Sequence, residues 1–322
     1  MAKTRKGKKK HDSATTDHAV LTGDVLNSSL SDVARTVDGS GYAFVRLNCA
    51  GKSITKIPEE IAAYVHLRYI DISDNHIEDI VPLTTLPHVL ALNAARNNIT
   101  DVSYLADTTC LPSCVVLNLS FNSIYELHSI GLPRLAKLTL DGNPLASLES
   151  VDKLPKSLTH LSLKDTHLRT ISQFPPLPKL VYLSVSNCPI DSITDVSMLA
   201  ALEILDISGI RLGNLGLLET LVTLPMLREL TILPVDHEMP DDNFRQEILV
   251  VLRKLQRLNG IDVTAEEKRR AKALKVQRKK ERQEAVKHER LQEETNGEAA
   301  YNPEDGSISG TAPVQDIFVE DA

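Results

Sequence analysis

The stretch LRYIDISDNHI, residues 67–77, combines apolar and polar positions and then reaches an asparagine. Leu67, Ile70 and Ile72 fit the buried side of a short strand, because successive side chains of a strand point to opposite faces. Asn75 is a poor choice for a strand interior. Its side-chain amide can donate and accept hydrogen bonds, so it can satisfy backbone groups where the chain turns inward. The stretch therefore predicts a strand followed by an asparagine-stabilised turn.

The same pattern returns along the central part of the chain. Further copies begin at Phe44, Val89, Cys114, Leu135, Leu158, Leu180, Leu202 and Leu227. The starts are about 21 to 25 residues apart, which is the spacing of leucine-rich repeats. About nine units result, more than the roughly three that a solenoid needs to bury its own core. The sequence predicts an α/β leucine-rich-repeat solenoid whose strands stack into one parallel, concave sheet.

The asparagine recurs in the units that follow. We expect a hydrogen-bonded ladder formed by Asn75, Asn97, Asn122 and Asn143. Smaller or apolar residues then take this position, in the order Thr166, Cys188, Ile210 and Val235. The ladder is therefore predicted to weaken toward the C-terminus.

The second half of each unit predicts a different local structure. In the first clear copy the apolar residues Ile77, Ile80, Leu83 and Leu86 are three apart, which favours short 3₁₀ or helical turns on the convex side. Prolines gather in these returns and keep them short. Units of this length resemble the class of intracellular leucine-rich repeats first recognised in a phosphatase regulator.

A solenoid needs a cap at each end, because an end repeat otherwise exposes its apolar face. Near-helical apolar spacing predicts a front capping helix over residues 24–37, stopped by Asp38 and Gly39. We expect five segments in all: a basic disordered arm at 1–20, the N-terminal capping helix at 21–43, the solenoid with its C-terminal cap at 44–263, a charged helix at 264–295 and an acidic disordered tail at 296–322.

The stretch NFRQEILVVLRKLQRLNG, residues 243–260, predicts the back cap, a helix followed by a strand-like end. It resembles the C-terminal cap of many intracellular leucine-rich-repeat proteins. Phe244 and Arg245 match the opening of the cap helix, and Asn259 and Gly260 stand at its Leu-Asp-Gly turn, with Asn in place of Asp.

The terminal segments carry most of the charge pattern. Formal net charge is −7, yet the first ten residues hold about six basic groups and the helix at 264–295 has a basic excess. That helix is either a solvated helix leaving the solenoid or a helix that docks on a partner. The basic arm is either a solubilising tail or a contact for nucleic acid, tubulin's acidic surface or an import receptor. The final VQDIFVEDA is a candidate docking motif.

Sequence motifs of catalysis and metal binding are missing. We find no phosphate-binding loop, no Gly-x-Ser-x-Gly elbow and no His-Glu-x-x-His. Cys110 and Cys114 lack a second pair at zinc spacing, and the aspartates around Asp74 lack the glycine and glutamate of a calcium loop. The sequence predicts no catalytic residues, metal, cofactor or small-molecule substrate.

The sequence also indicates the cellular compartment of the protein. The basic start lacks the apolar run of a signal peptide, and no segment approaches the roughly 18 apolar residues of a membrane span. The four cysteines lack the dense pairing of a secreted scaffold. We expect a reducing cytosolic compartment and no membrane contact.

What remains is a binding surface on the concave sheet. Tyr, Phe and Arg are the side chains that most often dominate protein interfaces, although any solenoid must expose something on this face. The candidate partner-binding residues are Arg68, Tyr69, Asp71, Arg96, Asn118, Phe121, Asp141, Lys164, Tyr182, Asp206 and Arg228.

Three stretches carry a more specific resemblance. YVHLRYIDISDNHIEDIVPL from residue 64, LGLLETLVTLPMLREL from residue 215 and NFRQEILVVLRKLQRL from residue 243 are similar to the leucine-rich repeat-containing protein 23 family, over about residues 21–271. The resemblance implies a non-catalytic scaffold of the ciliary axoneme that holds the head of a radial spoke through other spoke proteins. The basic start and the acidic end have no obvious counterpart in the family.

A second reading comes from a different class of protein. Nuclear or cytosolic regulators, such as splicing-particle repeat proteins or phosphatase-targeting subunits, share short repeats and this kind of back cap. MAKTRKGKKK would then be an import signal or an RNA contact. We expect other axonemal proteins rather than nucleic acid as partners, and a location in the cytoplasm and ciliary axoneme, with the nucleus as the alternative.

Overall fold

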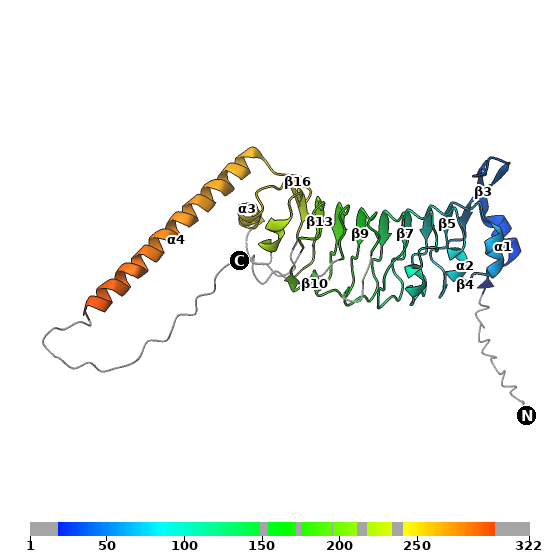
Figure 1. The fold of residues 1–322 in the computed structure, drawn as a ribbon, viewed down its shortest axis with the longest axis horizontal. Helices are drawn as coiled ribbons and strands as arrows, with labels where there is room; N and C mark the ends of the chain where they lie inside the picture. The colour runs from blue at the N-terminus through cyan, green and yellow to red at the C-terminus, as the bar shows by residue number, and fades with distance from the viewer. Residues whose placement is uncertain are drawn as a thin grey trace, which may run out of the picture.

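The computed structural model describes residues 19–148, 154–171, 175–194, 196–210, 218–233 and 241–299. The chain forms an elongated solenoid, with a β-hairpin rising from one end and the long helix α4 leaving the other (Figure 1). The predicted basic arm, apart from its last two residues, and the tail beyond residue 299 lie outside the described residues.

One twelve-stranded sheet runs the length of the solenoid. Its ten stacked strands are β3 (Tyr42–Asn48), β5 (Tyr69–Asp71), β6 (Ala91–Asn93), β7 (Val116–Asn118), β8 (Lys137–Thr139), β9 (His160–Ser162), β11 (Tyr182–Ser184), β13 (Ile204–Asp206), β14 (Glu229–Thr231) and β15 (Arg257–Leu258). Neighbouring strands in this stack are parallel. The predicted leucine-rich-repeat solenoid is therefore confirmed.

The register of the strands explains the buried core. Ile70 pairs with Leu92 and Leu92 with Leu117, so each repeat places its central apolar residue at the same depth. All three are nearly inaccessible to solvent, and one continuous apolar cluster extends from Leu21 to Ala271. Each unit buries its core only by stacking on its neighbours.

Asparagines form the ladder that the sequence predicts. Asn75 donates from Nδ2 to the carbonyl oxygens of Cys49 and Ile72 at 2.9 Å each, and its Oδ1 accepts from the backbone of Ile54 at 2.9 Å. The same contacts repeat one unit later, where Oδ1 of Asn97 accepts from the Ile77 backbone at 3.0 Å. Each asparagine therefore joins two adjacent repeats.

The ladder weakens toward the C-terminus, as expected. Thr166 makes a hydrogen bond of 2.9 Å to the Leu163 carbonyl, and the Cys188 thiol makes one of 3.1 Å to the same oxygen. Ile210 is fully buried and contributes packing alone. Val235 lies outside the described residues.

The returns are short, as their spacing predicts. They contain η1 (Glu59–Ala63), α2 (Val81–Thr84), η2 (Ser103–Ala106) and η4 (Thr220–Thr223). Two further strand pairs lie apart from the main sheet: β1 (Ala19–Val20) with β4 (Ile54–Lys56), and β10 (Thr170–Ile171) with β12 (Ser192–Ile193).

The predicted front helix over residues 24–37 is wrong in its second half. Helix α1 spans Gly23–Ser29, and β2 (Leu30–Arg35) then pairs antiparallel with β3. Val33 pairs with Phe44 and is 61% exposed, so it belongs to a hairpin surface rather than to a buried helical face. Asp38 and Gly39 form the hairpin turn, where Gly39 has a φ of +74°. Asp-Gly is a strong hairpin signal that the helical spacing obscured.

The back cap joins α3 (Asp241–Val251) to the last strands and to α4 (Ala265–Ala299). Phe244 is buried, while Arg245 pairs with Glu267 at 2.6 Å and donates to the Leu258 carbonyl at 3.0 Å. β16 (Ile261–Asp262) closes an antiparallel hairpin with β15. Thr264 and Glu267 form the predicted capping box, with backbone-to-side-chain distances of 3.2 and 2.7 Å.

Candidate interaction surface

The outward side chains of β3 to β14 form what we call the sheet face. Two rows run along it in register. The first row contains Arg46, Tyr69, Ala91, Val116, Lys137, His160, Tyr182, Ile204 and Glu229; the second contains Asn48, Asp71, Asn93, Asn118, Thr139, Ser162, Ser184, Asp206 and Thr231. The first row carries the aromatic groups, and the second is polar throughout.

Hydrogen bonds tie the polar row together. Nδ2 of Asn93 donates to Asp71 at 3.1 Å, and Nδ2 of Asn118 donates to Asn93 at 3.0 Å. The candidates Asp71 and Asn118 are therefore partly committed to the protein itself. Because these amides and carboxylates are already held in place, little side-chain entropy is lost when a partner binds to this row.

The aromatic row presents two small clusters. The guanidinium of Arg46 lies 4.9 Å from the centre of the Tyr69 ring, and the rings of His160 and Tyr182 stack at 5.8 Å. Tyr69 is 37% exposed. Such half-exposed aromatic rings supply large apolar area with a polar tip, which suits protein contacts.

Arg96 and Phe121 do not lie on the sheet strands, so their predicted place on the concave face is corrected. Each follows its strand by three residues, with φ values of 56° and 54°. They meet on the rim, where the Arg96 guanidinium lies 4.5 Å from the centre of the Phe121 ring and 3.8 Å from Asp74. Backbone hydrogen bonds from Arg96 to Ser120 at 2.8 Å and from Phe121 to Asp141 at 2.6 Å continue the pairing between repeats from the sheet face to this rim.

A charged cluster occupies the C-terminal half of the surface. Asp141 accepts from the Ser162 hydroxyl at 2.6 Å and from the Lys164 backbone at 2.9 Å, and the Lys164 ammonium lies 3.6 Å from Asp206. Partial burial raises the pKa of Asp206, but hydrogen bonds from Ser208 and Ser184 and the charge of Lys164 outweigh it and hold that pKa below its usual range. The Asp206 carboxylate and the Lys164 ammonium are therefore both charged at neutral pH.

The two remaining candidates precede their strands by one residue. Arg68 donates to the Arg35 carbonyl at 2.7 Å and so fixes the front hairpin to the sheet. Arg228 is exposed beside β14. The structure therefore distributes the candidates along one surface rather than gathering them into a single pocket.

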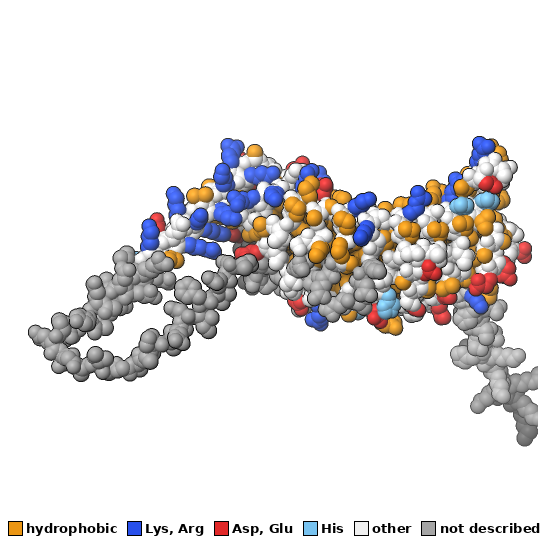
Figure 2. Space-filling model, viewed as in Figure 1, with side chains coloured by type: hydrophobic (Ala, Val, Ile, Leu, Met, Phe, Trp, Pro, Cys, Tyr) orange, Lys and Arg blue, Asp and Glu red, His pale blue; other side chains and the backbone are white. Residues whose placement is uncertain are grey.

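The front hairpin adds residues that the sequence reasoning missed. Tyr42, Phe44 and Val33 are 78%, 49% and 61% exposed, and the hairpin stands above the end of the sheet face (Figures 1 and 2). The missed signal is the alternation of Tyr42 and Phe44 with smaller residues beside an Asp-Gly turn, a strand pattern rather than a helical one.

Candidate metal ligands do not cluster in the part of the chain that the structure describes. Within it, no three His, Cys, Asp or Glu side chains are placed to share a metal ion. Burial raises the pKa of the Cys114 thiol to about 12, which makes it a poor nucleophile. The His66 and His88 rings stack on each other, with centres 6.5 Å apart. None of the helices described is both long and apolar enough to span a membrane.

Stacked parallel strands, the asparagine ladder and the caps define a leucine-rich-repeat protein. No protein-family model matches the chain. The chain is 31% identical to human leucine-rich repeat-containing protein 23 over 296 residues, which cover 84% of each protein. It is 30% identical to the Xenopus tropicalis protein of the same name over 289 residues, covering 82% of the chain and 81% of the relative. The chain belongs to the leucine-rich repeat-containing protein 23 family.

Solved structures give more distant similarities. An internalin from Listeria monocytogenes covers 69% of the chain, with 21% identity and a TM-score of 0.45; the chain covers 71% of it. The Drosophila melanogaster SNF/U2A′ complex covers 37% of the chain, with 22% identity and a TM-score of 0.34; the chain covers 68% of that structure.

Proposed function

We propose that this protein is a non-catalytic protein–protein interaction scaffold of the ciliary or flagellar axoneme, a radial-spoke component needed for spoke-head assembly and motility. Membership of the leucine-rich repeat-containing protein 23 family is the observation that carries the proposal, because the match covers 84% of both proteins. A stack of repeats buried against one another is a stiff rod, which suits a mechanical scaffold.

The sheet face and its rim are the proposed docking surface for other axonemal proteins. Tyr69 and Tyr182 offer half-exposed rings, and Phe121 with Arg96 offers an aromatic–cation pair on the rim. Charged groups such as Lys164 and Asp206 would fix the register of the partner rather than dominate affinity. Aromatic and arginine anchors of this kind carry most of the binding energy in typical interfaces.

Deletion of the gene in the source organism tests the proposal. We expect impaired motility and spokes that lack their heads in electron micrographs of isolated axonemes. Re-expression of the full chain should restore both, whereas Tyr69→Ala combined with Tyr182→Ala should restore neither, although the variant accumulates. Normal beating with intact spokes in the deletion strain would overturn the proposal.

The alternative is a nuclear or cytosolic regulator. The observation that favours it is 30% identity to the Drosophila melanogaster acidic leucine-rich nuclear phosphoprotein 32 family member A over 137 residues, which cover 42% of this chain and 51% of that protein. Fluorescent tagging separates the two readings. A flagellar signal that resists detergent extraction supports the scaffold of the axoneme, and a nuclear signal supports the regulator.

A further inference from the structure

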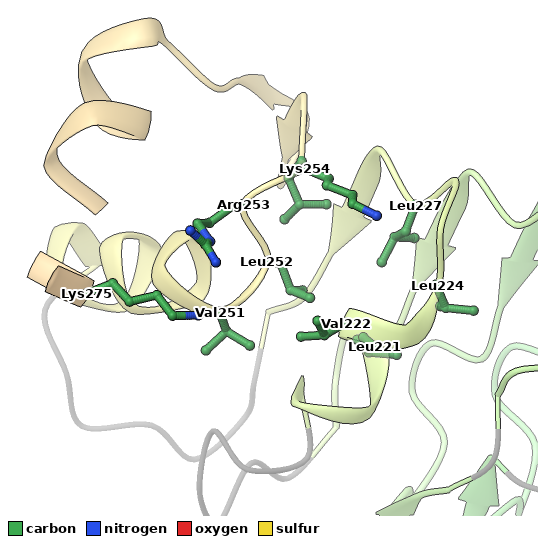
Figure 3. Close-up of a pocket in the computed structure, with 10 residues that line it drawn as sticks. Leu221, Val222, Leu224, Leu227, Val251, Leu252, Arg253, Lys254 and Lys275 are labelled. Atoms are coloured by element: carbon green, nitrogen blue, oxygen red, sulfur yellow. The ribbon is translucent and has the colours of Figure 1, made fainter. Parts of the chain in front are cut away.

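An apolar groove lies between η4 and the end of α3. Leu221 and Val222 of η4 lie opposite Val251 and Leu252 at the end of the cap helix (Figure 3). The cavity volume is about 130 Å³. This volume is comparable with the roughly 150 Å³ of an aliphatic cavity that accepts benzene, so one aromatic ring is about the largest group that fits in the groove.

Basic side chains surround the groove. Arg253, Lys254 and Lys275 lie at its edge, and all three are exposed (Figure 3). No ion pair between described residues involves any of them. Lys and Arg also gather along the adjoining α4 (Figure 2). The groove therefore has an apolar floor within a positive field.

A second groove continues the first along α4. The two share Val222, Val251 and Lys275, and the second has a volume of about 640 Å³. It is also lined by Glu219 and by Glu247, which is paired with Arg278 at 2.6 Å, but Lys275, Lys279 and Arg282 leave its lining with a basic excess. Val222 is 53% exposed and lines both grooves, so it offers apolar surface where they meet. The complementary ligand is an extended peptide with apolar side chains flanked by carboxylates.

The same chain contains a peptide of this chemistry. In residues 314–322, VQDIFVEDA, the apolar Ile317, Phe318 and Val319 stand between Asp316 and the acidic pair that follows. We propose that this segment docks in cis into the groove between η4 and α3, with Phe318 as the apolar anchor and the acidic residues facing the basic rim.

The chain is long enough for this contact. Lys275 lies at the groove, and α4 continues from it to Ala299, a distance of about 36 Å at 1.5 Å per residue. The residues between Ala299 and Phe318 span up to about 60 Å when extended. The segment can therefore return along α4, and in doing so its carboxylates pass the basic side chains of that helix. Occupancy by the segment would compete with any partner peptide of the same chemistry.

Photo-cross-linking of the full chain tests the proposal. The photoreactive residue p-benzoylphenylalanine replaces Phe318, the purified protein is irradiated at low concentration, and the products are mapped by mass spectrometry. We expect the main product to migrate as a monomer and to join residue 318 to peptides within 218–233 or 241–258. Cross-links scattered over the sheet face, no cross-link, or cross-links only between two chains would overturn docking in cis.

Two matched variants separate docking from general damage. Val222→Asp should lower the yield at least about fivefold, because a charge in an apolar groove disfavours the apolar anchor. Met198→Asp is the control, since Met198 is 50% exposed and lies neither on α4 nor in the lining of either groove. Equal losses in the two variants would contradict the proposal. The result of the cross-linking experiment does not depend on whether the protein acts in the axoneme.

Discussion

Single asparagines hold adjacent repeats together, and Asn122 shows how. Its Nδ2 donates to the carbonyls of Ala94 and Leu119 at 3.0 and 2.9 Å, and its Oδ1 accepts from the Ile99 backbone at 3.0 Å. Asn122→Ala leaves the buried Ile99 amide without a partner, at about 1–3 kcal/mol, and removes one of two hydrogen bonds from each carbonyl, since Ala94 keeps that from Asn97 at 3.1 Å and Leu119 that from Asn143 at 3.0 Å. We therefore expect a total loss of about 3 kcal/mol in the free energy of unfolding, measured by urea titration.

The control for this prediction is the neighbouring repeat's exposed asparagine. The side chain of Asn98 is exposed beside the ladder position, and Asn98→Ala should change the free energy of unfolding by less than about 0.5 kcal/mol. Similar losses in both variants would show that the ladder contributes no more than surface asparagines do.

Gly142 is the residue on which the rim depends. It has a φ of +66°, and a Cβ at this position would lie 2.4 Å from Cδ1 of Phe121. Gly142→Ala should therefore cost about 1–2 kcal/mol for the backbone and more for displacing the ring. In a double-mutant cycle with Phe121→Ala, measured by urea unfolding, part of the loss should disappear, because the ring that causes the clash is gone. If the two losses in the free energy of unfolding simply add, the clash between Phe121 and the new Cβ does not occur, and the prediction is wrong.

The elements that could be predicted from the sequence are those whose residue pattern recurs in every repeat. Leu67, Ile70, Ile72 and Asn75 recur at one spacing, so the strand, the inward turn and the ladder follow from a single copy. The front hairpin could not be predicted in this way, because Val33 and Val37 fit a helical period as well as a strand period. Pairing of Val33 with Phe44, a contact eleven residues apart, decided between them. Only the neighbouring strand supplies that information.

The binding surface was predicted only in outline for a similar reason. Tyr69 and Tyr182 lie on strands, where the period of two places them outward. Arg96 and Phe121 instead sit at left-handed positions that follow the strand, and non-glycine residues there are uncommon enough that propensity does not anticipate them. The apolar groove at the back cap joins segments that are distant in sequence, so no local pattern indicates it.

At the level of the back cap, one ion pair makes stability depend on pH. The hydrogen bond from Arg245 is the main reason that the pKa of Glu267 falls to about 2, with the contacts to Thr264 adding to it against partial desolvation. A lowered folded-state pKa contributes stability above the unfolded-state value of roughly 4.3, and this contribution is lost as pH falls toward about 2.

Glu267→Gln tests this ion pair, because glutamine keeps the capping hydrogen bonds but not the charge. We expect the variant to be less stable than the natural protein at pH 7 and the difference to shrink steadily as pH falls from about 5 to 2. Urea unfolding across that range measures it. A difference that stays constant with pH would assign the effect to the lost cap geometry instead of the charge.

For the whole molecule, the uneven ladder predicts uneven stability. A solenoid is nearly one-dimensional, so a weakly joined group of repeats can open without the rest. The Ala94 amide donates to Asn118 and the Ile207 amide donates to Thr231, at equivalent repeat positions and both at 2.9 Å. The two amides therefore have equivalent hydrogen bonds of their own. The Ala94 repeat is also held by side-chain hydrogen bonds from Asn97 and Asn122, whereas the ladder position of the Ile207 repeat is Ile210, which is apolar.

Native-state hydrogen exchange should therefore separate these two amides. We expect the Ile207 amide to exchange at least about tenfold faster than the Ala94 amide, because opening the later repeats breaks fewer side-chain hydrogen bonds. Asn122→Ala should reduce the protection of the Ala94 amide and leave that of Ile207 nearly unchanged. Equal protection at both sites would mean that all repeats open together, and that neighbouring interfaces transmit stability along the rod regardless of which residues form the ladder.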